Sequence, residues 1–358
     1  MTFITFPWTI YKKDPNWVPP LISDRKSFLN PEKNPFFNHA IVQLFIAYRE
    51  KKPVGTISAH IIYDHNKIHN DSTGFFGFFE AIDDQLVAHA LFETASSWLK
   101  CRGMTIMRGP MNFSIHDTCG LLVDGFDSSP CIMMTYNPRY YENLIDSFGF
   151  VKEADLYALV MDLKEKPGEH VRQIARDVRA DHPNIRIRKI NMDNYYEEAT
   201  FIKEQYDGAM VKNWGYLPFS DDVFMYTAKA MKPFIDPDLI VFAEIDNKII
   251  GYSMSIPDYN FILKKLNGRL FPFGIFKLLF FRKKISYGRM VALGVLPEFR
   301  DKRAAVLIYE DAWMNHIHAG YKRFEGGWTH EKNPFLSTTT WLGAKIHKTY
   351  RVYDYHIN

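Results

Sequence analysis

A loop rich in cationic side chains follows an apolar run near the C-terminus. The run 290-MVALGV-295 has the pattern of a buried strand, and it leads directly into 296-LPEFRDKRAAVLIYEDAW-313, where Arg300, Lys302 and Arg303 precede a helical pattern. A strand that ends in this way directs cations and free backbone N–H groups at one place, as in sites that hold an anion at a helix N-terminus. The sequence therefore predicts an anion site here. A solvated basic turn is the alternative interpretation.

A second group of polar side chains lies in the apolar stretch 111-MNFSIHDTCGLLVDGF-126. Asn112, Ser114, His116 and Asp117 follow the end of a predicted strand. Ligands of α/β proteins commonly bind where strands end. We expect these residues to line the substrate side of a cleft between two domains, and a purely structural hydrogen-bond network is the alternative.

The composition argues against several other classes of function. A net charge of +3 is too small to indicate nucleic-acid binding. His60, His65 and His69 lie in a polar hairpin turn without a partner cysteine, so no metal is expected there. The N-terminal residues do not resemble a secretory leader, and three cysteines without a CxxC pair suit a reducing compartment. These features predict a cytoplasmic protein.

The elements that must position these residues occur twice in the same order. The segments 46-IAYREKKPVGTIS-58 and 242-FAEIDNKIIGYSMS-255 both predict a β-hairpin, with Gly55 and Gly251 at an offset of 251 − 55 = 196. Each is followed by a helix, a glycine and a strand, at 91–110 and at 307–328.

A third pair completes the repeat. The segments 147–160 and 341–353 both predict a helix end, a glycine and a tyrosine-bearing strand. We therefore expect two α/β units, at 1–163 and 186–358, joined by a polar linker at 164–185.

The chain resembles the bacterial ceramide synthase-like proteins of the GNAT acyltransferase superfamily, and the likeness spans nearly the whole sequence. It is carried by 6-FPWTIYKKDPNWVPPL-21, 34-NPFFNHA-40, 74-GFFGFFE-80, 108-RGPMNFSIHDTCGLLVDGF-126, 133-MMTYNPRYY-141, 287-YGRM-290, 295-VLPEFR-300 and 328-WTHEKN-333. The resemblance implies an α/β fold with mixed sheets, built from two GNAT-like units in tandem.

The resemblance also implies a coenzyme A site in the C-terminal unit. The GNAT loop (Q/R)-x-x-G-x-(G/A) aligns with Arg300, Arg303 and Ala305, so only the glycine position departs from the pattern. We expect the loop residues Lys302 and Ala304 to contribute as well. Backbone N–H groups near Leu293, Gly294 and Val295 are expected to bind the pantetheine and the thioester oxygen. At the equivalent place in the N-terminal unit, Asp83 and Asp84 would repel a pyrophosphate.

The same resemblance suggests residues for the chemistry. Tyr350 is expected to protonate the departing thiolate, with Tyr353 as an alternative. Glu331 is expected to accept the amine proton, and His330 competes for this role because one strand cannot direct both into one cleft. Asn333 is expected to contact pantetheine or acceptor, or to cap the helix that starts near Pro334.

The expected function is transfer of an acyl group from acyl-CoA to an amine, with a long-chain, sphingoid-like amine as one candidate acceptor. Two alternatives are an acyl-CoA binding protein without turnover and an aminoacyl-tRNA-dependent transferase. The modest charge and the lack of a heptad-patterned arm argue against the second.

One segment suggests contact with a membrane. Residues 260–288 combine Phe, Leu and Ile with seven cationic residues and no acidic residue. This composition suits a surface that dips into anionic lipid at the inner face of the membrane. The alternative is an insertion packed against the N-terminal unit with its lysines in water.

Overall fold

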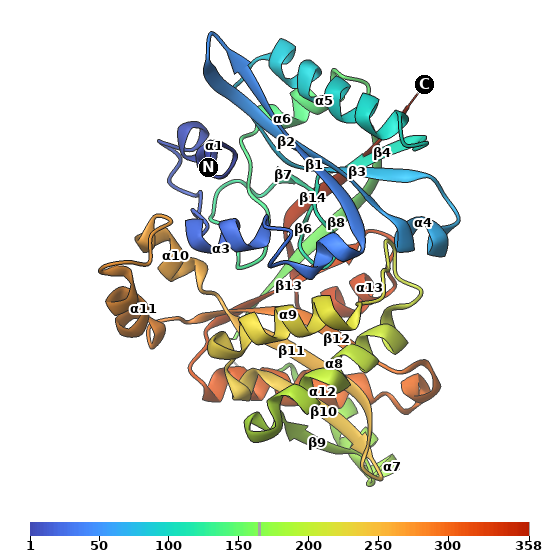
Figure 1. The fold of residues 1–358 in the computed structure, drawn as a ribbon. Coiled ribbons are helices and arrows are strands. Elements are labelled where there is room, and N and C mark those ends of the chain that lie inside the picture. Colours follow the sequence, from blue (N-terminus) through green and yellow to red (C-terminus); the bar gives the residue numbers. More distant parts are fainter. Residues whose placement is uncertain (164–165, 358) are drawn as a thin grey trace. The chain divides into compact units, whose positions relative to one another are not determined.

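The computed structural model describes residues 1–163 and 166–357, which form two compact units. Unit 1 contains Met1–Leu156, Asn260–Arg282 and the described part of Lys348–Asn358. Unit 2 contains the described part of Tyr157–Tyr259 together with Lys283–His347. Both units are mixed α/β structures, as the sequence predicts (Figure 1).

Unit 1 is built on a sheet with the strand order β1-β2-β3-β4-β14, and β7 pairs with β14. Its elements are α1 (Thr2–Thr5), α2 (Pro7–Ile10), α3 (Ile22–Phe28), η1 (Pro35–Asn38), β1 (Ala40–Arg49), β2 (Lys52–Ile62), α4 (Tyr63–His69), β3 (Thr73–Ala81), α5 (Gln85–Lys100), β4 (Ile106–Gly109), β5 (Met111–Asn112), β6 (Thr118–Cys119), β7 (Leu121–Asp124), α6 (Tyr140–Asp146), the first part of β8 (Val151–Asp162), α10 (Asn260–Leu266), α11 (Gly274–Arg282) and most of β14 (Lys345–His356).

The core of unit 1 forms where α5 packs on its sheet. The buried helix residues Val87, Leu91 and Phe92 pack in one cluster with strand residues such as Phe76 and Phe79. Phe113, fully buried, lies in a separate aromatic cluster. Its ring contacts those of Phe28, Phe36 and Phe78, with centroids 4.9, 4.7 and 5.1 Å away.

Unit 2 is built on a sheet with the order β13-β12-β11-β10-β9. Its elements are the end of β8, α7 (Glu169–Asp181), β9 (Arg186–Lys189), η2 (Met192–Asn194), α8 (Tyr195–Met210), α9 (Asp221–Met231), η3 (Lys232–Phe234), η4 (Pro237–Leu239), β10 (Ile240–Ile245), β11 (Lys248–Pro257), β12 (Tyr287–Val295), η5 (Pro297–Lys302), α12 (Ala304–His318), β13 (Arg323–His330), α13 (Phe335–Trp341) and the start of β14.

Helices cover both faces of the unit 2 sheet. Along β10, Val241 packs in a cluster with residues of α7 and α12, whereas its neighbours Ile240 and Phe242 pack with residues of α8 and α9. Successive side chains of a strand point to opposite faces, so α7 and α12 lie on one face and α8 and α9 on the other.

The two β-hairpins confirm the sequence repeat in detail. The β1–β2 turn has Glu50 and Lys51 at positive φ, and the β10–β11 turn has Asp246 and Asn247 at positive φ. Such residues suit a tight two-residue hairpin turn. Each hairpin also carries an irregularity in register three residues before the turn, next to the pairs Ala47–Gly55 and Ala243–Gly251.

Gly55 and Gly251 share a steric requirement. A Cβ on Gly55 would lie 2.7 Å from Cδ1 of Leu91, and a Cβ on Gly251 would lie 2.8 Å from the carbonyl oxygen of Gly294. Both positions therefore need a residue without a side chain. The other two predicted repeats are confirmed as well, since α5 and α12 lead into β4 and β13, and α6 and α13 lead into β8 and β14.

The unit boundaries differ from those expected at 1–163 and 186–358. Strand β14 begins in unit 2, but from Lys348 onward it belongs to unit 1. There Tyr353–His356 pairs with β4, and Arg108 donates two hydrogen bonds to Asp354, at 2.8 and 2.7 Å. The C-terminal strand thus completes the sheet of unit 1. Strand periodicity does not specify which neighbour a strand pairs with, so this exchange was not predicted.

The expected linker at 164–185 also differs from the structure. Its described part contains α7, which belongs to unit 2. Ala175 and Val178 of α7 are buried against α12, and Arg179 forms ion pairs with Glu310 and Asp311 at 2.6 and 3.0 Å. Charged residues on the outer face of a packed helix therefore gave this segment the composition of a linker.

None of the helices in residues 1–163 and 166–357 is long and apolar enough to span a membrane.

Candidate active site

Strands β12 and β13 of unit 2 separate part-way along their length. Their parallel pairing ends at Met290 and Gly326, although β12 continues to Val295 and β13 to His330. On the other side of β12, the register with β11 shifts so that Val291 forms a bulge. A bulge bends its strand and interrupts pairing, which accounts for the separation at this point.

The separated part of β12 directs backbone groups away from β11. The N–H of Leu296 donates to the carbonyl of Ile250 at 2.9 Å, and Gly294 lies two residues before Leu296 in the same antiparallel register. Hydrogen-bonded and non-bonded pairs alternate in such a ladder. The N–H groups of Leu293 and Val295 therefore point toward the side of β13.

The loop between β12 and α12 has the backbone shape of an anion site. The 3-10 turn η5 is followed by Arg303 at φ 54°, ψ 24°, and α12 begins at Ala304. Arg303 therefore adopts the left-handed conformation at the position where the GNAT loop has glycine. The N–H groups of Ala304 and Ala305 precede the helical hydrogen-bond ladder, and N–H groups in this position bind anions well.

The three cations of the loop have different surroundings. Arg300 donates from Nε to the carbonyl of Val295 at 3.2 Å and from Nη2 to the carbonyl of Ala209 at 2.9 Å. Arg300 thus ties the loop to the end of β12 and to the C-terminal turn of α8. Lys302 is half-buried, and Arg300 and Arg303 are exposed. Because the guanidinium of Arg300 is bound to these two carbonyls, the side chains of Lys302 and Arg303 are the better placed to meet a bound anion.

The equivalent helix start in unit 1 is blocked by a carboxylate. Oδ1 of Asp84 accepts hydrogen bonds from the N–H groups of Leu86 and Val87, at 3.0 and 3.3 Å, at the start of α5. Asp84 also forms an ion pair with Arg49 at 2.8 Å. The Asp84 carboxylate therefore already occupies the N–H groups at this helix start.

The residues expected at the end of β13 have the following contacts. The ring of His330 stacks on Trp214 at 5.6 Å, and its Nδ1 accepts a hydrogen bond from the N–H of Lys332 at 3.1 Å. Oδ1 of Asn333 accepts from the N–H of Phe335 at 2.9 Å, so Asn333 caps the start of α13. Glu331 is half-buried next to His330.

Tyr350 and Glu331 belong to different units. Tyr350 lies in the part of β14 that belongs to unit 1, is fully buried and pairs with Leu122 of β7. Tyr353 is also buried and packs in the core of unit 1. The catalytic role of Tyr350 stays a prediction that rests on the family resemblance.

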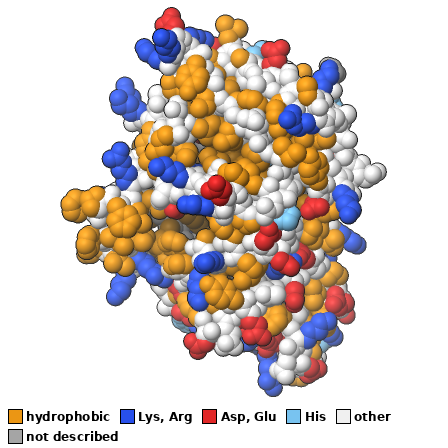
Figure 2. Space-filling view, in the orientation of Figure 1, with side chains coloured by type: hydrophobic (Ala, Val, Ile, Leu, Met, Phe, Trp, Pro, Cys, Tyr) orange, Lys and Arg blue, Asp and Glu red, His pale blue; other side chains and the backbone are white. Residues whose placement is uncertain are grey.

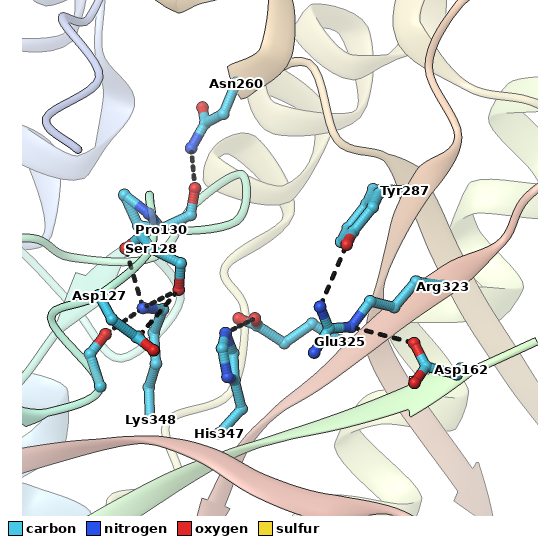
Figure 3. Close-up of polar contacts among 11 residues, drawn as sticks. Asp127, Ser128, Pro130, Asp162, Asn260, Tyr287, Arg323, Glu325, His347 and Lys348 are labelled. Atoms are coloured by element: carbon cyan, nitrogen blue, oxygen red, sulfur yellow. Dashed lines mark hydrogen bonds and ion pairs between the residues drawn. The ribbon is translucent and has the colours of Figure 1, made fainter. Parts of the chain in front are cut away.

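Two buried charged residues at the base of the separation were not predicted. Arg289 and Glu325 are opposite each other one residue before the β12–β13 pairing ends. Arg289 donates from Nη2 to the carbonyl of Gly327 at 3.0 Å, and its guanidinium lies 5.2 Å from the centre of the Trp328 ring. Figure 3 shows Glu325 facing His347, whose Nε2 is 3.9 Å from Oε2 of the carboxylate. The signal missed was a charged residue within a strand whose neighbours are buried.

The polar residues expected to bind the acceptor form two hydrogen-bonded groups within unit 1, one around Asn112 and one around Asp117. Oδ1 of Asn112 accepts from the N–H of Phe78 at 2.6 Å, and its Nδ2 donates to Oγ1 of Thr118 at 2.6 Å. Oδ2 of Asp117 accepts from the hydroxyl and from the N–H of Ser114, at 3.0 and 3.2 Å. Burial raises the pKa of Asp117 to about 6.

The N–H of His116 donates to the hydroxyl of Ser114 at 3.2 Å, which joins His116 to the group around Asp117. The structure thus brings His116 and Asp117 together through Ser114.

Glu80 lies near the end of β3 and is the last residue of 74-GFFGFFE-80, but it was not predicted as a site residue. Oε2 of Glu80 accepts a hydrogen bond from Tyr141 at 2.7 Å, while the Tyr141 oxygen accepts from the N–H of Ala81 at 2.9 Å. Burial raises the pKa of Glu80 to about 7, although hydrogen bonds from Tyr141 and Tyr11 and the charge of Arg25 act in the opposite direction. A carboxyl that titrates near neutral pH is suited to exchange protons with an amine.

Lys348 is a further buried charge that the sequence did not indicate. Its ammonium group donates to the carbonyl of Gly125 and, at 3.0 and 2.9 Å, to the carbonyl and hydroxyl oxygens of Ser128 (Figure 3). Three oxygen acceptors compensate its burial, which is the usual condition for an interior charge. These contacts hold the loop around Ser128 to β14 within unit 1.

The three histidines considered for a metal do not lie in a hairpin turn, because His60 is buried in β2 and His65 and His69 belong to α4. Nε2 of His60 lies 2.7 Å from the carbonyl oxygen of Phe113, and burial lowers the pKa of His60 to about 4. The rings of His65 and His69 lie 4.2 Å apart. Within residues 1–163 and 166–357, no group of three or more His, Cys, Asp or Glu is arranged to hold a metal ion.

The raised pKa of Glu80 predicts a dependence of stability on pH. The folded protein holds the proton of Glu80 more tightly than the unfolded chain does, and this adds to the free energy of unfolding. The contribution is fully present below pH 4.5, the ordinary pKa of the carboxyl, and it is lost as the pH rises through about 7. We expect the protein to be less stable at pH 8 than at pH 5. About 2 kcal/mol of this difference should disappear in Glu80→Gln, after a discount for partial exposure.

Urea unfolding at the two pH values measures this difference. Asp117 acts in the same direction, so Glu80→Gln should reduce the dependence rather than abolish it. Glu50→Gln, at an exposed turn, is the control. An unchanged pH dependence in Glu80→Gln contradicts the prediction.

Comparison of the sequence with known proteins gives two relatives of nearly full length. The bacterial ceramide synthase of Caulobacter vibrioides (strain NA1000 / CB15N) is 35% identical over 364 residues, which cover 98% of this chain and 93% of that protein. Protein YghO of Escherichia coli (strain K12) is 34% identical over 366 residues, which cover 99% of this chain and 92% of that protein. No protein-family profile matches the chain.

Comparison with solved structures gives GNAT folds. A tandem GNAT protein from the clavulanic acid biosynthesis pathway aligns with a TM-score of 0.58 at 11% identity, over 99% of this chain and 94% of that one. A GCN5-related glucosamine N-acetyltransferase region of a fungal multi-domain β-N-acetylglucosaminidase aligns with a TM-score of 0.59 at 14% identity, over 98% of this chain and 36% of that one. At these identities the likeness shows the fold.

The sequence relationship covers both units, and the structural relationship includes a protein with two GNAT units. Both agree with the repeated hairpins. The chain therefore belongs to the bacterial ceramide synthase family, a family of acyltransferases, and folds as two GNAT units in tandem.

Proposed function

We propose that this protein is an acyl-CoA-dependent N-acyltransferase whose acceptor is a long-chain, sphingoid-like amine. One observation carries the coenzyme part of the proposal. In unit 2, strand β12 separates from β13 and leads into a loop that carries Lys302 and Arg303. Arg303 has a left-handed backbone conformation and directly precedes the start of α12.

This arrangement fits the two chemically distinct parts of acyl-CoA. The pantetheine arm contains amides, which can pair with the N–H groups of Leu293 and Val295 as an added strand would. The pyrophosphate is an anion, which the N–H groups of Ala304 and Ala305 and the cation of Arg303 can bind. Ala305 is half-buried whereas Ala304 is fully buried, so the backbone of Ala305 is the more accessible of the two.

The proposed reaction forms a C–N bond and breaks a C–S bond. The neutral amine attacks the thioester carbonyl, and the N–H groups of β12 stabilise the oxyanion that develops. Glu331 accepts the proton that the amine loses, directly or through water. Tyr350 donates a proton to the departing thiolate, which leaves as free coenzyme A.

The nature of the acceptor is suggested by the relative from Caulobacter vibrioides. That protein is named a ceramide synthase, and a ceramide is the amide of a fatty acid with a sphingoid amine. Within unit 1, Asp117 and Glu80 provide carboxyl groups that titrate near neutral pH, which suits a group that arrives as an ammonium ion. We propose that Asn112, His116 and Asp117 bind the acceptor.

The proposal predicts release of free thiol from acyl-CoA only when a suitable amine is present. The purified protein should be tested with acyl-CoA thioesters of several chain lengths, each with short amines and with sphingoid bases. Mass spectrometry should detect an amide product, and a thiol reagent should detect coenzyme A in equal amount. Glu331→Gln should retain coenzyme binding and lose most turnover.

Two results would overturn the proposal in different ways. Binding of acyl-CoA without an amide product from any amine would assign the protein to acyl-CoA binding. Failure to bind any acyl-CoA would remove the coenzyme site itself.

A further inference from the structure

The segment Asn260–Arg282 folds as a pair of helices that belongs to unit 1, although the sequence places it between β11 and β12 of unit 2. Its first helix, α10, is attached to the loop around Ser129. Nδ2 of Asn260 donates to the carbonyl of Pro130 and Nζ of Lys264 donates to the hydroxyl of Ser129, both at 2.9 Å. The expected alternative of an insertion packed on the N-terminal unit is thus correct for α10.

The turn after α10 is attached to the N-terminal residues. Nε1 of Trp8 donates to Oδ1 of Asn267 at 3.0 Å, and the N–H of Ile22 donates to the carbonyl of Gly268 at 3.0 Å. A Cβ on Gly268 would lie 2.4 Å from the Trp8 ring, so this close contact requires glycine. The base of the segment is therefore fixed to unit 1 on two sides.

The second helix, α11, and the residues just before it present apolar side chains to solvent. Phe271 and Phe273 are each 72% exposed, and Phe276, Leu279 and Phe280 are 68%, 66% and 65% exposed. We call these five residues the apolar tip. Figure 2 shows hydrophobic atoms gathered on α11, at the left of the view, with Lys and Arg atoms beside them.

This concentration is unusual for the described chain. Among the residues that the structure describes, six phenylalanines are exposed, and five of them lie in 261–280, the sixth being Phe234. Exposed apolar clusters of this kind mark surfaces that contact another phase or molecule. Buried positions elsewhere in the segment, such as Ile262 and Leu266, show that α10 has its own packing and does not need the tip.

The charges around the tip identify the partner. Residues 260–282 contain no acidic residue, and their exposed cations are Lys264, Lys265, Arg269, Lys277 and Arg282. Apolar side chains bordered by cations match a lipid surface with anionic headgroups, because the apolar groups enter the acyl region while the cations meet phosphates. The nine residues of α11 extend only about 14 Å, which suits insertion into one leaflet.

We propose that the apolar tip and its bordering cations dock unit 1 onto an anionic membrane surface. The proposal stands independently of the acyl-transfer chemistry. It requires the protein to bind anionic vesicles at low salt and to bind less when salt screens the cations, since the screening length falls to about 10 Å at 0.1 M.

Co-sedimentation of the full chain with vesicles tests the docking. Vesicles of phosphatidylcholine with one-third phosphatidylglycerol are compared with pure phosphatidylcholine, at low and high salt. Phe276→Ser with Phe280→Ser, and separately Arg269→Glu with Arg282→Glu, should each weaken binding by about 10-fold or more. Ile68→Ser with Leu86→Ser, and Lys51→Glu with Lys52→Glu, change exposed residues elsewhere in unit 1 and should have no effect.

A fluorescent label reports insertion directly. In a Cys101→Ser background, an environment-sensitive dye on Phe276→Cys should gain emission on anionic vesicles, and the same dye on Leu86→Cys should not. A parent protein that fails to sediment with anionic vesicles at low salt would overturn the proposal. So would tip variants that bind like the parent, or self-association in ultracentrifugation that the tip variants abolish, which would assign the tip to a second copy of the chain.

Discussion

Replacing both Lys302 and Arg303 with glutamine is expected to weaken binding of coenzyme A by about 100-fold, as measured by titration calorimetry. Each side chain is proposed to form a charge-assisted contact with the pyrophosphate, and such contacts contribute roughly 1.5–3 kcal/mol each. Both residues are solvent-accessible, so the lower end of this range applies. Two contacts of about 1.5 kcal/mol each correspond to the expected loss of about 100-fold in affinity for coenzyme A.

Single variants separate the charge of Arg303 from its backbone. Arg303 adopts a left-handed conformation that glycine adopts without strain, so Arg303→Gly should preserve the loop and remove only the cation. We expect it to bind coenzyme A about 10-fold more weakly, whereas Arg303→Lys should bind almost like the parent. If Arg303→Gly binds as tightly as the parent, the backbone alone holds the anion and the role given to the guanidinium is wrong.

Arg300 provides a contrast because its guanidinium is bound to the carbonyls of Val295 and Ala209. Its replacement by alanine should disturb the loop itself and lower the thermal stability of unit 2, which the Lys302 and Arg303 variants should not do. Arg186→Gln with Lys229→Gln removes two exposed cations elsewhere in unit 2 and controls for net charge.

Tyr350→Phe is expected to lower kcat about 100-fold while leaving the KM for acyl-CoA nearly unchanged. Loss of a general acid typically costs this much, and a group that acts only as the thiolate leaves does not contribute to ground-state binding. Tyr350 is fully buried in β14, and phenylalanine keeps its ring, so the fold should be preserved. Steady-state kinetics with the best amine from the activity panel provide the measurement.

Tyr353→Phe is the matched control because this tyrosine is buried three residues later in the same strand. Its ring packs in the core of unit 1, and its hydroxyl has no proposed role in the reaction. A loss of activity in Tyr353→Phe alone would move the assignment to that residue. A Tyr350→Phe enzyme as active as the parent at every pH would exclude Tyr350 as the proton donor.

The sequence by itself determined the repeated architecture and the place of the cationic loop between β12 and α12. The turn residues Asp246 and Asn247 and the left-handed Arg303 act through local backbone geometry, and the apolar periodicity of strands and helices is also local. Local signals of this kind can be read in order along a chain. They were sufficient for two hairpins, two helix–strand pairs and a strand–loop–helix unit that carries cations.

The tertiary structure alone decided which strand completes which sheet and which charges are buried. Strand β14 completes the sheet of unit 1, α10 and α11 join unit 1, and Arg300 binds carbonyls instead of facing solvent alone. Glu80 and Glu325 acquire their surroundings from segments distant in sequence, such as those around Tyr141 and His347. Pairing partners and desolvation depend on contacts between distant segments, and no local pattern encodes them.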